Sequence, residues 1–134
     1  MRLLLDTHIL LWATGWTVSA ERRSPLSAEA IALIGSEDNQ PMFSVVSLWE
    51  VAIKSALGRS DFAVDPRLLR RGLLDNGYVE LAILGEHAVA ASSLPPLHGD
   101  PFDRLLVAQS IVEGIQLLTA DRIVAQYPGP IRLV

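Results

Sequence analysis

MRLLLDTHILLW, residues 1–12, is the stretch that predicts the fold. Its residues 3–5 are apolar without alternation, which is typical of a strand covered on both faces in a parallel α/β sheet. Asp6 follows at once, and a helical pattern begins near His8. Ligands of open α/β sheets bind beyond the carboxyl ends of the strands, so Asp6 is a candidate site residue. The alternative interpretation is that Asp6 only caps the following helix.

The composition is typical of a single globular domain spanning residues 1–134. Half of the residues are hydrophobic and 19% are charged, which argues against disorder. Cysteine is absent, which excludes disulfides, thiolate zinc sites and cysteine nucleophiles, and we expect the cytoplasm as the compartment. No apolar run approaches the roughly 18 residues of a membrane span, so we expect neither secretion nor membrane insertion. The net charge of −4 argues against coating of nucleic acid by charge alone, and any such contact should be local.

Strand and helix signals alternate along the rest of the chain. Apolar or β-prone runs predict strands at residues 3–5, 42–46, 78–84, 115–119 and 131–134. Helical spacing predicts helices that begin near residues 8, 27, 47, 66, 85 and 101, with one further helical turn after residue 120. Residues 15–25 are expected to form a loop. This alternation predicts an α/β fold with a mostly parallel sheet.

Particular residues mark the expected starts of these elements. Asp65 and Asp100 are each followed by proline, the combination of an N-cap with a suitable first helical residue. Ser47 precedes Glu50 by three positions, which predicts a capping box and a helix start. Pro41 is expected to precede the second strand rather than to lie within it.

Four acids follow the predicted strand ends or begin the helices after them: Asp6, Glu50, Asp103 and Asp121. Each could be explained alone, because an acid at a helix N-terminus gains roughly 0.3–1 kcal/mol. Together they are harder to explain, since two carboxylates ~5 Å apart repel by about 3 kcal/mol at an effective dielectric constant near 20. The cluster therefore predicts a cation. Oxygen ligands favour Mg²⁺ or Mn²⁺, and such a site suits phosphodiester hydrolysis.

The sequence resembles the PIN-domain ribonucleases, in particular the VapC toxins of bacterial toxin–antitoxin pairs. The matching stretches are residues 5–8 with 11–12, 47–54, 98–109 and 118–121. The resemblance implies a three-layer α/β/α fold with strand order 3-2-1-4-5 and a Mg²⁺- or Mn²⁺-dependent endoribonuclease acting on RNA. It implies that Asp6, Glu50, Asp103 and Asp121 are the catalytic and metal-binding acids. It also implies a homodimer inhibited by a cognate antitoxin.

Several neighbours of the acids are candidate accessory residues. We expect Asp103 to be the ligand and Asp100 to be the N-cap of the same helix. Thr7 is predicted to bond Asp6 or a metal-bound water, or else the local backbone. Arg104 and Arg122 each adjoin an expected ligand and are the candidate phosphate contacts.

Other residues receive structural interpretations. Lys54 lies four positions after Glu50, which predicts an exposed ion pair. His8 and His98 could contact phosphate, although a single histidine near a loop is more often structural. Tryptophan is expected in the core or at a dimer face rather than against a base, with Trp16 exposed in its loop.

Two rival function classes are considered. The first is a catalytically inactive PIN-like binding module regulated by a protein partner, and the intact set of four acids argues against it. The second is a phosphoacceptor receiver-like domain, which uses paired acids after the first strand and a lysine after the last. Thr7 and His8 follow Asp6 instead, and no lysine occurs after Lys54. The ribonuclease prediction is therefore preferred.

Overall fold

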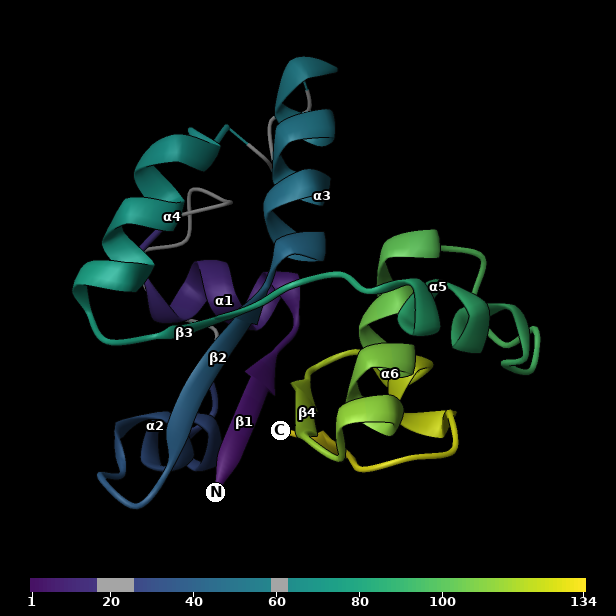
Figure 1. Ribbon diagram of the computed structural model, residues 1–134. Helices are drawn as coiled ribbons and strands as arrows, with labels where there is room; N and C mark the ends of the chain where they lie inside the picture. The colour runs from purple at the N-terminus through teal and green to yellow at the C-terminus, as the bar shows by residue number, and fades with distance from the viewer. Residues whose placement is uncertain (17–25, 59–62) are drawn as a thin grey trace.

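The structure, a computed structural model, describes residues 1–16, 26–58 and 63–134. Within these residues the chain forms a five-stranded parallel sheet in the order β3-β2-β1-β4-β5 (Figure 1). Its strands are β1 (Arg2–Leu5), β2 (Gln40–Ser44), β3 (Val79–Leu81), β4 (Gln116–Thr119) and β5 (Ile131–Leu133). The predicted α/β class and strand order are confirmed, and β1 lies at the centre of the sheet.

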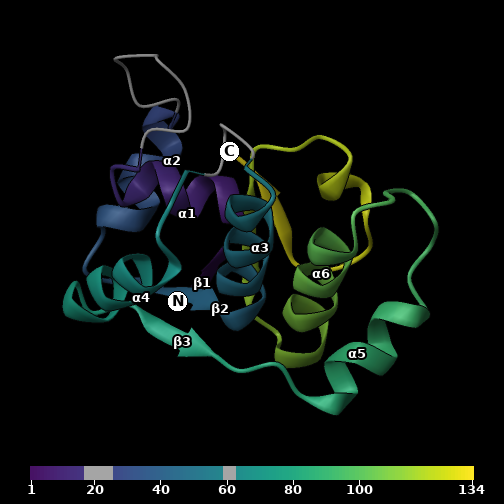
Figure 2. The ribbon, with the colours of Figure 1, turned by 90° about the horizontal axis from the view of Figure 1, so that it is seen from above.

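Helices cover both faces of this sheet. They are α1 (Thr7–Ala13), α2 (Ala28–Gly35), α3 (Val45–Ala56), α4 (Pro66–Asp75), α5 (Gly85–Ser92) and α6 (Pro101–Glu113), with a short 3-10 turn η2 (Val124–Gln126). Leu3 and Leu5 pack with side chains of α1 and α4, whereas Leu4 packs with side chains of α6. Alternate residues of β1 thus face opposite layers, as strand geometry requires. Figure 2 shows α5 beside α6, at the opposite end of the molecule from α4.

The second strand differs from its prediction at Pro41. β2 begins at Gln40, two residues before the predicted start at residue 42, and Pro41 pairs with Leu3 of β1. β3 joins β2 only from Met42 onwards. Proline has no N–H to donate, and it is tolerated here because no strand of the described residues pairs with the β3 edge of β2 at this position.

The start of α3 also differs from its prediction. The helix follows β2 without a loop, and the Ser44 hydroxyl accepts a hydrogen bond from the Val46 N–H at 3.0 Å. Ser44 is therefore the N-cap, and the predicted capping box of Ser47 with Glu50 is wrong. The local spacing was compatible with either serine, and the end of β2 decided between them.

Other predicted boundaries can be compared directly. The starts of α4 and α6 are confirmed, because Asp65 and Asp100 each accept hydrogen bonds from the first N–H groups of their helices. β3 ends at Leu81, well short of the predicted residue 84, because its partner strand turns into α3 after Ser44. No helix in residues 1–16, 26–58 and 63–134 has the length and apolarity needed to cross a membrane.

Candidate functional site

Asp6 lies at the carboxyl end of β1 and caps α1 at the same time. Its Oδ1 accepts a hydrogen bond from the Ile9 N–H at 2.9 Å, and its Oδ2 accepts one from the Thr119 hydroxyl at 2.5 Å. Thr119 ends β4, which pairs with β1. Burial raises the pKa of Asp6 above its ordinary value of 3.8, although both hydrogen bonds oppose this shift. Capping of α1 therefore accounts for Oδ1 of Asp6, whereas Thr119 holds Oδ2 at the carboxyl edge of the sheet.

Glu50 extends from the second turn of α3 and is only 2% exposed. Its Oε1 accepts a hydrogen bond from the Thr7 hydroxyl at 2.6 Å, and its Oε2 accepts one from Lys54 Nζ at 2.5 Å. Thr7 was predicted to bond Asp6 or the local backbone, but its hydroxyl contacts Glu50 and Ser47 instead. Its position at the start of α1 lets it link β1 to α3.

Lys54 lies inside the acidic site rather than on an open helix face. Its side chain is 13% exposed, and Nζ also lies 3.7 Å from Asp100 Oδ2. The predicted ion pair with Glu50 is present, but it is not exposed, because α3 packs against α6 and covers it. The ammonium of Lys54 is shared by two acids that would otherwise repel each other.

Asp100 and Asp103 have different roles at the start of α6. Asp100 Oδ1 accepts hydrogen bonds from the N–H groups of Phe102 at 2.8 Å and Asp103 at 3.4 Å, so it is the N-cap. The pKa of Asp103 is raised from 3.8 to about 8, first by burial and then by the negative charges of Asp100, Glu50, Asp6 and Asp121. The four predicted acids therefore share one electrostatic neighbourhood, together with Asp100.

Asp121 lies in the turn after β4. Its N–H donates to Thr119 Oγ1 at 3.0 Å, and Thr119 in turn donates to Asp6, so one threonine holds both acids. Its Oδ2 lies 3.3 Å from His98 Nε2, and this nitrogen is 3.4 Å from Asp103 Oδ2. His98 therefore belongs to the acidic centre. The sequence did not predict that His98 contacts two of the acids, because the pattern around residue 98 does not reveal its distance from residue 121.

The chemistry of these groups fits a divalent cation. Among the described residues, His98, Asp103 and Asp121 each offer a ligand atom within 4.8 Å of the others. Carboxylate oxygens suit hard ions such as Mg²⁺ and Mn²⁺. Burial raises the pKa of Asp103, and the negative charges of the neighbouring acids raise it further, so these acids repel one another. A bound dication would relieve that repulsion.

The two arginines predicted to contact phosphate have different surroundings. Arg104 donates hydrogen bonds to the Tyr127 hydroxyl and to three backbone carbonyls, those of Ala91, Leu94 and Pro95. It ties the loop before α6 to the helix, and a phosphate contact would require these bonds to break. Arg122 is exposed beside Asp121, and its contact with phosphate stays a prediction.

The tryptophans differ in exposure. Trp12 and Trp16 pack against the core on the α1 face, so the expected exposure of Trp16 is wrong. Trp49 is 53% exposed and meets the ring of Phe102 edge-on, with 5.2 Å between the ring centroids. Trp49 therefore lies on the exposed surface of α3, the helix that carries Glu50, where it meets α6, the helix that carries Asp103.

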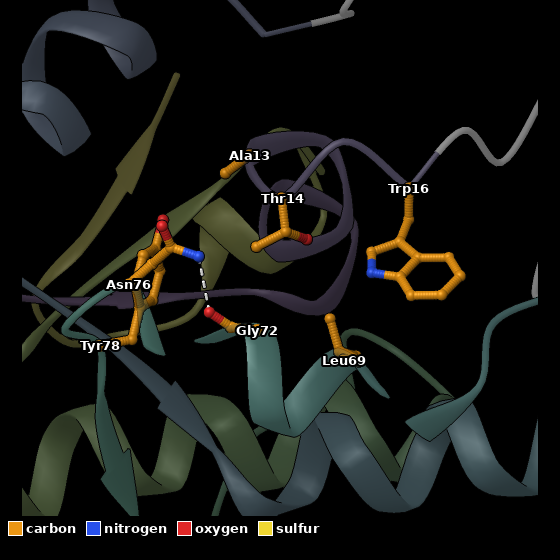
Figure 3. A pocket seen from close by; sticks show the side chains of 7 residues that line it. All are labelled: Ala13, Thr14, Trp16, Leu69, Gly72, Asn76 and Tyr78. Atoms are coloured by element: carbon orange, nitrogen blue, oxygen red, sulfur yellow. Dashed lines mark hydrogen bonds between the residues drawn. The ribbon is translucent and has the colours of Figure 1, made fainter. Parts of the chain in front are cut away.

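A pocket of about 380 Å³ lies between α1 and α4 (Figure 3). It is lined by Ala13, Thr14, Trp16, Leu69, Gly72, Asn76 and Tyr78. The dashed line in Figure 3 is the bond from Asn76 Nδ2 to the Gly72 carbonyl, 2.7 Å long. None of these lining side chains is charged, so the acidic centre is the candidate for phosphodiester chemistry. Most of the predicted 15–25 loop, residues 17–25, lies outside the described residues.

Comparison with known proteins agrees with this geometry. Residues 3–130 match the PIN domain family. Ribonuclease VapC22 of Mycobacterium tuberculosis is 29% identical over 128 residues, which cover 95% of this chain and 92% of that protein. A chain in the crystal structure of VapBC2 from Rickettsia felis bound to a promoter DNA fragment matches with a TM-score of 0.68 and 15% identity, covering 99% of this chain and 98% of that one. This chain therefore belongs to the PIN-domain family, and its resemblance to VapC-type ribonucleases is confirmed.

Proposed function

We propose that this protein is a Mg²⁺- or Mn²⁺-dependent endoribonuclease and the toxin of a toxin–antitoxin pair. The observation that carries the proposal is the gathering of Asp103 and Asp121 around His98, with ligand atoms within 4.8 Å of one another, and burial and the neighbouring acids raise the pKa of Asp103 there. Structural carboxylates usually gain partners that lower their pKa, whereas functional sites often concentrate like charges. The similarity to Ribonuclease VapC22 supports RNA as the substrate. The absence of cysteine supports a cytoplasmic location.

The chain's own residues prepare the site for hydrolysis. A divalent ion held by these acids would supply Lewis acidity for hydrolysis of the phosphodiester. Asp103 and Asp121 offer the oxygens for that ion, and Thr119 keeps Asp6 and Asp121 beside one another. Thr7 and Lys54 fix both oxygens of Glu50, so this acid enters the site with its orientation set.

The test is cleavage of defined RNAs by the purified protein with Mn²⁺ or with chelator. Asp103→Asn should lower the rate by more than about 100-fold, beyond the 10–100-fold typical of partners outside the ligand set. Asp100→Asn keeps an N-cap oxygen and should lower it much less. Asp65→Asn changes the same aspartate-proline helix start in α4 and is the matched control. Equal losses in Asp100→Asn and Asp103→Asn would contradict the ligand assignment, and cleavage with chelator would contradict metal dependence.

We propose that a cognate antitoxin inhibits the protein by placing an arginine or lysine among the acids. Support comes from the VapBC2 complex, since one of its chains has the fold of this protein, and from the acidic side chains gathered around Asp103. A basic antitoxin segment should compete with RNA for the wild type. It should bind Asp103→Asn less tightly, since asparagine cannot lose a proton to pair with the inserted cation. Simultaneous binding of antitoxin and RNA, with cleavage unaffected, would contradict this model.

We propose that the protein is a homodimer. The exposed Trp49, packed edge-on against Phe102, supports a surface that another protein copy could cover. Sedimentation of the wild type should give a dimer, and Trp49→Ala should shift the equilibrium towards monomer. A monomeric wild type at all accessible concentrations would contradict the assembly.

A further inference from the structure

His98 lies in the loop before α6, and its imidazole reaches two of the acids. Nε2 is 3.3 Å from Asp121 Oδ2 and 3.4 Å from Asp103 Oδ2. Distance alone would make this nitrogen the third ligand of a cation held by Asp103 and Asp121. A histidine ligand would also favour transition metals over Mg²⁺.

The other ring nitrogen argues against that role. His98 Nδ1 accepts a hydrogen bond from the Asp100 N–H at 3.0 Å. A neutral imidazole has one N–H and one acceptor nitrogen, so an accepting Nδ1 places the hydrogen on Nε2. A nitrogen that carries hydrogen has no lone pair in the ring plane for a metal. Nε2 is therefore a donor towards the two carboxylates.

The rest of the histidine is fixed as well. The His98 N–H donates to the Tyr127 hydroxyl at 2.8 Å, which anchors the backbone that carries the ring. Asp100 holds the ring through an N–H at the start of α6. A rotation that exchanged the two ring nitrogens would lose this bond.

Asp121 receives this donor on one of its two carboxylate oxygens. Its side chain is 40% exposed, whereas that of Asp103 is 20% exposed. Asp121 Oδ1 accepts hydrogen bonds within its own turn, from the N–H groups of Ile123 and Val124. Its Oδ2 faces His98. Thr119 and Lys54 give Asp6 and Glu50 comparable support through hydrogen bonds to their carboxylates.

We infer that His98 is a positioning residue whose Nε2–H holds Asp121 beside Asp103 and does not itself coordinate the cation. The inference rests on the proposed function in one respect, namely that Asp103 and Asp121 bind a divalent ion. It assigns the ion to the carboxylate oxygens and gives the imidazole the task of orienting one of them. Metal-binding proteins commonly orient a ligand through such an outer hydrogen bond.

Two substitutions test the donor role of His98. His98→Gln places an amide nitrogen near the position of Nε2 and keeps an N–H donor. Because the amide oxygen of glutamine can also bind a divalent ion, the spectra of the unaltered protein described below decide between a donor and a ligand. His98→Ala removes the donor. Mn²⁺ binding, measured by calorimetry on chelator-treated and dialysed protein, should weaken about 10–100-fold in His98→Ala and recover to within about threefold of wild type in His98→Gln. Equal weakening in both variants would overturn the inference.

A second measurement uses the unaltered protein and so does not depend on how the variants fold. Nitrogen-15 correlation spectra of the imidazole rings should show hydrogen on His98 Nε2 both before and after Mg²⁺ is added. Loss of that hydrogen on addition of Mg²⁺ would identify a ligand and overturn the inference. If the wild type bound neither Mg²⁺ nor Mn²⁺, both this inference and the proposed function would be contradicted. Tight binding by wild type with equal losses in the two variants would overturn the role of His98 alone.

Discussion

Asp103→Asn should change how the stability of this protein depends on pH. In the folded protein the pKa of Asp103 is about 8, because burial and four neighbouring acids disfavour its charge, compared with an ordinary value of 3.8. A raised folded-state pKa means that the folded protein keeps a proton that the unfolded chain has lost. The stability from this proton is complete below pH 3.8 and disappears as pH rises through about 8.

The size of the effect follows from that shift. Each pH unit between the two pKa values corresponds to about 1.4 kcal/mol. Between about pH 6 and about pH 9 the wild type should lose about 2.7 kcal/mol of unfolding free energy through Asp103, a loss that Asp103→Asn should not show. The side chain is only 20% exposed, so solvent screens the interaction weakly.

The assay is urea unfolding of both proteins across this pH range, with chelator and then with Mn²⁺. Taking the difference between the two proteins largely cancels the titrating groups that lie outside the acidic centre. Mn²⁺ at about a hundred times its dissociation constant should add about 2.7 kcal/mol to the wild type and much less to the variant. Below about pH 8 the apparent affinity should fall about tenfold per pH unit, because the proton must leave Asp103 before the ion binds.

Two results would refute this reasoning. Parallel pH profiles for the wild type and Asp103→Asn would show that no shared proton stabilises the acidic centre. A variant less stable than the wild type at every pH, together with a wild type indifferent to Mn²⁺, would show that Asp103 stabilises its helix start and nothing more.

Two further substitutions test the packing around the site and the last turn of the fold. Lys54→Met should lower the free energy of unfolding by about 3–5 kcal/mol, measured with denaturant and chelator, since it leaves the buried Glu50 without its cation. Lys54→Arg should lower it much less. Equal stabilities of the wild type and Lys54→Met would show that the ammonium is dispensable. Gly129→Ala should lower the free energy of unfolding by at least about 1–3 kcal/mol, because φ is +132° and a Cβ would lie 2.7 Å from Ile111 Cγ1. Gly35→Ala, whose Cβ would meet no atom within 4 Å, is the control in the same unfolding measurement.

The sequence alone determined the features that depend on short stretches of chain. An apolar run followed by Asp6 identified β1 and its helix, and the aspartate-proline pairs identified the starts of α4 and α6. These signals are local, because an N-cap bonds N–H groups two or three residues away. The alternation of elements also predicted the parallel sheet and hence the gathering of the acids. The strand order came from the family resemblance.

Only the tertiary structure decided the environment of each side chain. Ser44 rather than Ser47 caps α3 because β2 ends there, and Lys54 is enclosed because α6 packs against α3. Arg104 bonds the carbonyls of Leu94 and Pro95 in the loop before α6, contacts that the sequence does not show. The physical reason is range: hydrogen bonds and charges act over a few ångströms in space, and residues 6 and 119, or 98 and 121, come that close only after the sheet has assembled.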